Sequence, residues 1–158
     1  MRRFILTVPL AVLVIAGCTG PQPTGPVAAT STPVTASAGT ALYAVPSRIL
    51  DEIVIDAQGF VLYRSDRDTA APTNSGCTGQ CGRSWLPVSC TGEVRVEGID
   101  RQLVDCFDRA DGGRQLSLAG WPLYGYAGDR MPGEINGHGL DGEWFAISPA
   151  GDRAVYLP

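Results

Sequence analysis

The chain has 158 residues, enough for one ordinary domain, and 44% of them are hydrophobic, which is typical of a globular protein. Its formal net charge of −4 argues against nucleic-acid binding. All 12 basic residues are arginine, which excludes lysine chemistry such as a Schiff base or the phosphate-binding lysine of a P-loop. His138 is the only histidine, which excludes multi-histidine metal sites.

Residues 1–17 have the pattern of a signal peptide. Arg2 and Arg3 precede an apolar run, from Phe4 to Ala16, that is too short to span a membrane. The run ends in Val-Ile-Ala-Gly-Cys, which resembles the bacterial lipobox. That resemblance implies that Cys18 carries a diacylglycerol and becomes the mature N-terminus, so we expect a lipid anchor on the outer face of the cell membrane. The alternative is an ordinary secretory signal with an incidental cysteine.

Residues 18–41 are expected to form a tether after the lipidated cysteine. From Thr19 to Thr40 there is no charged or aromatic residue, and Pro, Thr, Ser, Gly and Ala dominate. Such a composition buries too little apolar surface to fold. The folded domain is therefore expected to cover residues 42–158.

Within this domain, two segments resemble each other. Residues 59–68 and 120–129 have Gly, Leu, Tyr and Asp at the same spacing, and each leads through a Gly-rich loop to a tryptophan, Trp85 or Trp144. This indicates two related units of about sixty residues. If the units are equivalent, Tyr63 and Tyr124 occupy matching places and both rings are buried.

The domain is predicted to be all-β, with two related β-hairpin repeats packed on one core. Short segments rich in β-branched and aromatic residues alternate with Asp/Gly/Pro turns, and no window shows a sustained helical period. One short helical turn is expected around residues 79–85. The expected strands are 42–45, 49–55, 60–64, 94–97, 103–107, 115–118, 122–126, 144–148 and 154–157.

The motifs resemble those of a family of bacterial lipoproteins known as the secreted repeat of unknown function. Residues 124–129 fit its Tyr-x-(Phe/Trp/Tyr)-x-x-Asp signature, and residues 76–87 resemble its Cys-Thr-Gly-x-Cys segment leading into Trp-Pro-Pro. The first copy departs from the signature, because Ser65 stands where the middle aromatic belongs, and Leu86 replaces a proline. The resemblance implies little about activity, since the function of the family is not established.

Four cysteines remain beside Cys18. An even number of cysteines in an exported protein favours disulfides over a metal or redox site. The family-like segment holds Cys77 and Cys81 as a unit, which suggests that these two pair. Cys90 and Cys106 then pair with each other across a hairpin expected to turn near Gly98.

A candidate ligand-binding set lies in and after the second repeat. Aromatic side chains there are candidates for stacking on a sugar or peptide, although core packing is the commoner role for aromatics on strands. His138 lacks the sequence context of a catalytic triad. The loop 133–142 carries oxygen ligands suited to calcium, but its spacing fits no EF-hand. The candidate residues are Tyr124, Tyr126, Asp129, His138 and Trp144.

Two classes of function remain. The favoured one is a non-catalytic, lipid-anchored module that binds a glycan or protein of the cell envelope, because no catalytic constellation is recognisable. The other is a redox or electron-transfer accessory that uses the extracellular cysteines near Trp85. We expect no cofactor, no metal and no nucleic-acid partner.

Overall fold

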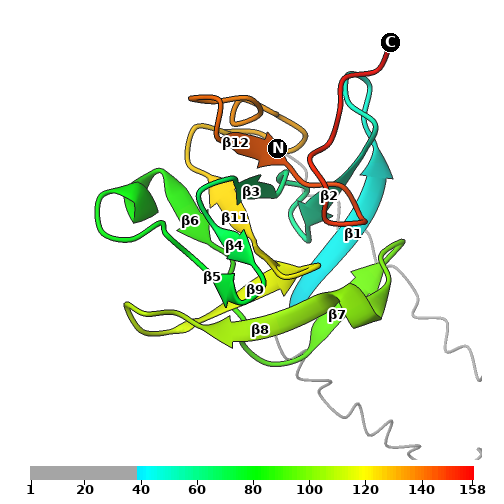
Figure 1. The fold of residues 1–158 in the computed structure, drawn as a ribbon. Coiled ribbons are helices and arrows are strands. Elements are labelled where there is room, and N and C mark those ends of the chain that lie inside the picture. Colours follow the sequence, from blue (N-terminus) through cyan, green and yellow to red (C-terminus); the bar gives the residue numbers. More distant parts are fainter. Residues whose placement is uncertain (1–38) are drawn as a thin grey trace, which may run out of the picture. The chain divides into compact units, whose positions relative to one another are not determined.

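A computed structural model describes residues 39–158, and these residues belong to one compact unit. The expected signal peptide, the lipidation site Cys18 and most of the expected tether lie outside the described residues. The domain is all-β, as its sequence predicts, with two short 3₁₀ helices in the described part (Figure 1). Its first strand begins at Thr40, two residues before the expected boundary.

Within the described residues, twelve short strands form four sheets, with strand orders β2-β1-β7, β10-β9-β8, β12-β3-β11-β6 and β4-β5. One 3₁₀ helix, Cys81–Arg83, falls in the expected helical turn; the other is Arg101–Leu103. The strands are β1 Thr40–Pro46, β2 Glu52–Asp56, β3 Tyr63–Ser65, β4 Thr69–Ala70, β5 Thr73–Asn74, β6 Trp85–Pro87, β7 Val94–Glu97, β8 Val104–Asp108, β9 Arg114–Leu118, β10 Trp121–Pro122, β11 Tyr124–Tyr126 and β12 Trp144–Ala146.

The expected strands 154–157 and 49–55 differ from the structure. Residues 154–157 form no strand, although isolated bridges join Leu50 to Tyr156 and Ile147 to Arg153. Their neighbour is the irregular loop 47–51, in which the Ser47 hydroxyl accepts the amide hydrogens of Ile49 and Leu50. The loop conformation interrupts the ladder, so residues 49–51 are also left out of β2.

The β1–β2 and β8–β9 hairpins are equivalent. Leu42 pairs with Asp56 in the first, and Val104 pairs with Leu118 in the second, so every partner number differs by 62 between the hairpins. Their loops, 47–51 and 109–113, are equally long. The internal repeat therefore begins well before the Tyr segment from which the sequence reveals it.

The central sheet interlocks the two repeats. Its inner strands β3 and β11 pair with Tyr63 opposite Tyr124, and both tyrosines are fully buried, as predicted. The outer strand β12 of the second repeat pairs with β3, and β6 of the first pairs with β11 (Figure 1). The Trp strand of each repeat thus pairs with the Tyr strand of the other repeat. The two halves share one hydrogen-bonded sheet, whereas the sequence predicts two hairpins that only pack on each other.

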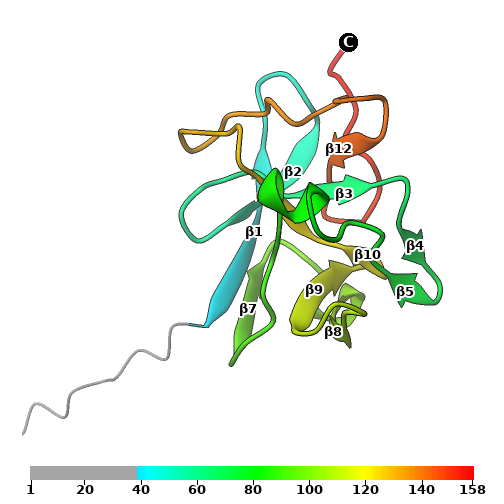
Figure 2. The ribbon, with the colours of Figure 1, turned by 90° about the vertical axis from the view of Figure 1, so that its left-hand side faces the viewer.

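The third strand beside β1 corrects the expected hairpin at Gly98. β7 pairs in parallel with β1 rather than with β8, which pairs with β9 (Figure 2). Gly98 does turn the chain, with φ of 72°. A Cβ there would lie 2.9 Å from the Cβ of Ala44, so the close approach to β1 also requires glycine.

The structure contains the two disulfides that the sequence predicts, Cys77–Cys81 and Cys90–Cys106. Cys90 packs into one hydrophobic cluster, which also contains Leu116 and Leu123. Cys77 packs into a second cluster, which holds the paired tyrosines and the tryptophans of the repeats. Each disulfide therefore belongs to a different part of the core.

Candidate functional site

Two tyrosine–aspartate contacts cross between the repeats. The Tyr63 hydroxyl donates to Asp129 Oδ2 at 2.6 Å, and the Tyr124 hydroxyl donates to Asp68 Oδ2 at 2.7 Å. Within each family signature, the aspartate therefore serves the tyrosine of the other copy rather than its own. The motif joins the repeats.

The second oxygen of each carboxylate also has a partner. Asp68 Oδ1 accepts the Gly76 amide hydrogen at 2.7 Å, and Asp129 Oδ1 accepts that of Asn136 at 2.9 Å. Burial raises the pKa of both carboxyl groups, and burial is also the main reason why the pKa of Tyr63 rises. Both oxygens of each carboxylate are therefore engaged in hydrogen bonds that connect the two repeats or fix the following loop.

The tryptophans of the two repeats stack on each other at the junction. The Trp85 and Trp144 rings lie 3.8 Å apart at 6°, and Tyr63 and Tyr124 approach them edge-on at 5.5 and 5.1 Å. Tyr126 adds a further ring on Trp85 at 4.4 Å. Trp144 and Tyr124 are buried in the core, so their rings present no open platform to a sugar or a peptide.

His138 lies apart from this stack, half-buried between the rings of Phe145 and Tyr156. Its Nδ1 accepts the Ala146 amide hydrogen at 3.3 Å, which requires the tautomer that carries hydrogen on Nε2. Burial lowers the His138 pKa, and the charge of Asp51 opposes that shift. The structure therefore brings Tyr124, Trp144 and Asp129 together around the junction and gives His138 a separate packing role.

A small cleft lies where the first repeat lacks its aromatic residue. Ser65 matches Tyr126, whose ring covers Trp85, and around Ser65 there is a cleft of about 110 Å³. Trp144 and the Cys77–Cys81 disulfide line it. This places a disulfide beside the end of the tryptophan stack.

Arg109 fills a polar site at the loop of the second hairpin. Its guanidinium donates to Ser75 Oγ, Gln115 Oε1, the Cys77 carbonyl oxygen and the carboxylate of Asp111. The side chain is 7% exposed. Hydrogen bonding to Asp111 is the main cause of its raised pKa, so the group is a permanent buried cation.

The matching place in the first half is an open apolar cleft of about 350 Å³. In the register of the hairpins, Ser47 stands where the second half has Arg109. Asn136 and Gly76 make equivalent bonds to the two aspartates, so the residues preceding them also match. Isoleucines around the first hairpin match the three side chains that accept hydrogen bonds from Arg109: Ile49 matches Asp111, Ile53 matches Gln115, and Ile135 of the second repeat matches Ser75 of the first.

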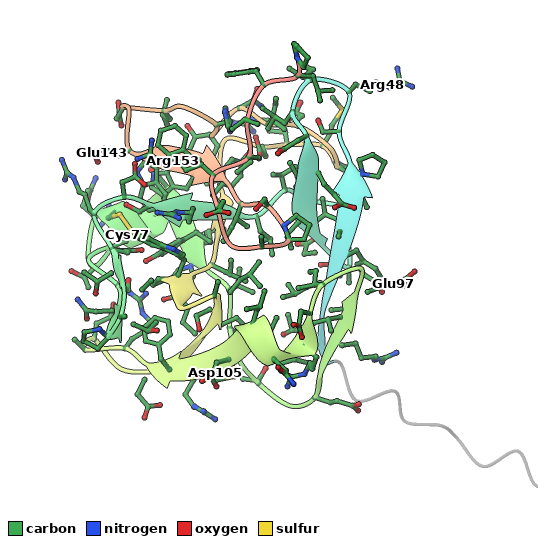
Figure 3. All side chains as sticks on the ribbon, turned by 45° about the vertical axis from the view of Figure 1, so that its right-hand side comes forward. Arg48, Cys77, Glu97, Asp105, Glu143 and Arg153 are labelled. Atoms are coloured by element: carbon green, nitrogen blue, oxygen red, sulfur yellow. A yellow bond between two sulfur atoms is a disulfide. The ribbon has the colours of Figure 1, made fainter. Side chains whose placement is uncertain are left out.

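The rest of the cleft is also largely apolar. Val45, Pro46 and Ile55 from the β1–β2 hairpin contribute to its walls, and Gly59 and Gly133 close it on the opposite side. Arg48 supplies the charged group among its lining residues. Figure 3 shows Arg48 at the outer end of the hairpin, with its side chain extending away from the domain.

Within residues 39–158, no group of three or more His, Cys, Asp or Glu side chains is arranged to hold a metal ion. In the same described part, no helix is both long and apolar enough to cross a membrane.

The fold and site define an all-β protein of two interlocked repeats with one filled and one open hairpin site. Its sequence matches a family described as "secreted repeat of unknown function" over residues 48–89 and 106–148, and the chain belongs to this family. The matches cover both Tyr strands and both Trp strands, and the description makes the protein an exported one. No curated protein and no solved structure matches the chain.

Proposed function

We propose that the protein is a lipid-anchored, non-catalytic binding module on the outer face of the cell membrane, and that the apolar cleft at the β1–β2 hairpin is its ligand site. The observation that carries this proposal is the difference between the halves. One hairpin site is filled by the chain's own Arg109, whereas the matching site is open and apolar. A pocket that one of the protein's own side chains fills has no room for a ligand. An open cleft with mostly apolar walls is typical of a ligand site.

The residues that suggest chemistry are engaged in packing. The paired aspartates hold tyrosines, and His138 accepts a backbone amide hydrogen. A catalytic base needs a reacting group within hydrogen-bonding reach. This engagement supports binding rather than catalysis.

Native mass spectrometry of protein extracted from membranes tests the binding function. A co-purifying molecule that dissociates from the Ile53→Gln variant supports the cleft as the site. Ile53 is buried, so retained ellipticity of the tryptophan stack must show that this variant is folded. A protein that carries no ligand, or one that keeps its ligand in the folded variant, contradicts the proposal.

The lipid anchor has its own test. The Val-Ile-Ala-Gly-Cys run supports it, and two acyl chains give stable membrane binding where one chain does not. Mature wild-type protein is expected to partition with membranes and to carry the mass of an N-terminal diacylglycerol. The Cys18→Ser variant lacks this mass. Detection of the unmodified Cys18 thiol in membrane-bound wild-type protein would count against the anchor.

A redox accessory is the second candidate, because the Cys77–Cys81 disulfide borders the small cleft beside Trp144. Alkylation of freshly extracted protein separates the two functions. A structural disulfide leaves both cysteines protected, whereas a redox function gives a fraction of protein with alkylated Cys77 and Cys81. Cys90 and Cys106 serve as the internal reference.

A further inference from the structure

We propose that the open cleft binds a fatty acid, with the aliphatic chain along the isoleucines and the carboxylate at Arg48. This inference rests on the proposed binding function and assigns the chemical class of its ligand. Two observations support it. Arg109 of the chain fills the matching site at the second hairpin, and isoleucines stand at the first hairpin where the polar partners of Arg109 stand at the second.

The second half shows the shape of the occupant. Arg109 has a linear aliphatic stem that begins at the hairpin loop and ends in a cation. The buried Ser75 and Gln115 accept its hydrogen bonds on the inner side, and the exposed Asp111 accepts them at the rim. The first hairpin keeps the same register and the same loop length, and isoleucines stand at the three receiving positions around it, with Ile49 at the rim. The space therefore still suits a linear chain, while its inner end now suits a methyl group and not a charge.

The polar end of the ligand must then lie at the mouth of the cleft. Ile49 at this rim is 54% exposed, although it is a large aliphatic residue, and it stands in the position of Asp111. Arg48 is exposed next to it and adds a positive charge to the mouth. A cation at the rim of an aliphatic cleft is complementary to an anionic head on an aliphatic tail.

The cleft is less suited to a peptide, because a peptide backbone brings amide groups that lose hydrogen bonds with water. The Ser47 hydroxyl, a polar group at this loop, already accepts the amide hydrogens of Ile49 and Leu50. On the other side of the cleft, the Gly133 amide donates to the Gly59 carbonyl. The apolar tail of a fatty acid needs none of these groups.

Displacement of a dansyl-labelled fatty acid by dodecanoic acid tests the assignment. The protein is residues 19–158, which contain the whole compact unit, produced in an oxidising compartment without detergent. Saturable binding at one site per chain is expected. Affinity should increase about fourfold per methylene along a series of shorter acids, because each buried methylene contributes about 0.8 kcal/mol. Displacement independent of chain length overturns the proposal.

Substitutions at the rim locate the site without disturbing the core. Ile49→Asp introduces the residue that the second half has in this position, and it should weaken dodecanoic acid binding at least tenfold. Leu86→Asp is the control, since Leu86 is 50% exposed on β6 and lies outside the cleft lining. Equal weakening by both variants would overturn the assignment of the site.

The head group has a separate readout. Wild-type protein should bind dodecanoic acid about fivefold more tightly than dodecyltrimethylammonium, which has the same chain and the opposite charge, since exposed ion pairs contribute up to about 1 kcal/mol. Arg48→Glu should abolish or reverse this preference. An unchanged preference overturns the role of Arg48.

Other occupants give different results. Concentration-dependent dimerisation that Ile49→Asp abolishes, with no displacement by dodecanoic acid, would make the cleft an interface between copies and overturn the fatty-acid site. A molecule of another class, found on membrane-extracted protein by native mass spectrometry, would also overturn it while leaving the binding function intact. If dodecanoic acid does not bind and native mass spectrometry finds no ligand on membrane-extracted protein, the proposed binding function is itself contradicted.

Discussion

At the scale of residues, the family signature forms two tyrosine–aspartate hydrogen bonds that cross between the repeats, called the crossed ties below. A tyrosine hydroxyl and a carboxylate that are both buried need each other, because each would otherwise lose its hydrogen bonds to water on folding. Tyr63 bonds Asp129 of the second repeat, and Tyr124 bonds Asp68 of the first. Each buried pair is therefore satisfied only when the two repeats are together. The middle aromatic of the signature is not needed for these hydrogen bonds, since Ser65 occupies that position in the first copy.

Tyr63→Phe tests this role. The change removes the hydroxyl that donates to the buried Asp129, so we expect a loss of about 1–3 kcal/mol in the free energy of unfolding, measured by urea denaturation. Tyr156→Phe is the matched control, because Tyr156 is 62% exposed, and it should change stability by less than about 0.5 kcal/mol. Equal effects of the two substitutions would mean that the crossed tie contributes nothing.

At the scale of elements, the sequence predicts the strands that carry alternating or β-branched residues and fails where pairing is decided at long range. β7 occupies residues 94–97 as expected, because the Val-Arg-Val-Glu pattern alternates. Its partner is β1, more than forty residues earlier, and no local turn signal indicates that choice. Residues 154–157 have strand-like composition, yet their neighbour is a loop that offers no regular ladder.

The candidate site shows the same limit. The aromatic and aspartate positions were recognisable as a set from spacing, because they recur in two copies. Their burial depends on the exchange of the Trp strands, which spacing does not reveal. The isoleucine cleft is visible only when the β1–β2 and β8–β9 hairpins are aligned, and the sequences of those hairpins differ too much to reveal their equivalence alone.

The two disulfides allow a test of how elements are held. Replacing Cys90 and Cys106 by alanine should lower the free energy of unfolding by about 3 kcal/mol, because the closed loop is long enough for a large entropic effect on the unfolded chain. Replacing Cys77 and Cys81 opens a loop of sequence separation 4 and should cost less. Urea denaturation of both double variants measures this difference. A larger loss for the short bridge would show that packing of Cys77 beside Trp85 outweighs chain entropy.

At the scale of the whole molecule, a nearly symmetric pair of repeats differs at its two hairpin sites. The central sheet, the tyrosine ties and the tryptophan stack relate the two halves closely. The hairpin sites break this relation, because one holds Arg109 and the other is open. The symmetric contacts therefore hold the two halves together, and the departure from symmetry leaves the cleft that we propose as the ligand site.

This division predicts that Arg109 and its polar partners stabilise the second hairpin as a unit. Arg109→Ser, which introduces the residue of the first half, leaves Gln115 Oε1, Ser75 Oγ and the Cys77 carbonyl without their cationic donor. The expected loss is about 3 kcal/mol in the free energy of unfolding. Adding Gln115→Ile should recover part of this loss, because isoleucine has no hydrogen bond to lose and the first half has isoleucine there.

The cycle formed by wild type, the two single variants and the double variant measures the coupling between Arg109 and Gln115. Gln115→Ile alone should also destabilise the protein, since Arg109 stays buried with one partner fewer and the Leu123 carbonyl oxygen loses the Gln115 amide. The double variant should therefore be more stable than the sum of the single losses predicts, by about 1 kcal/mol or more. Additive losses would mean that Arg109 and Gln115 act independently. The polar groups at the second hairpin would then not form a single unit that corresponds to the apolar cleft at the first hairpin.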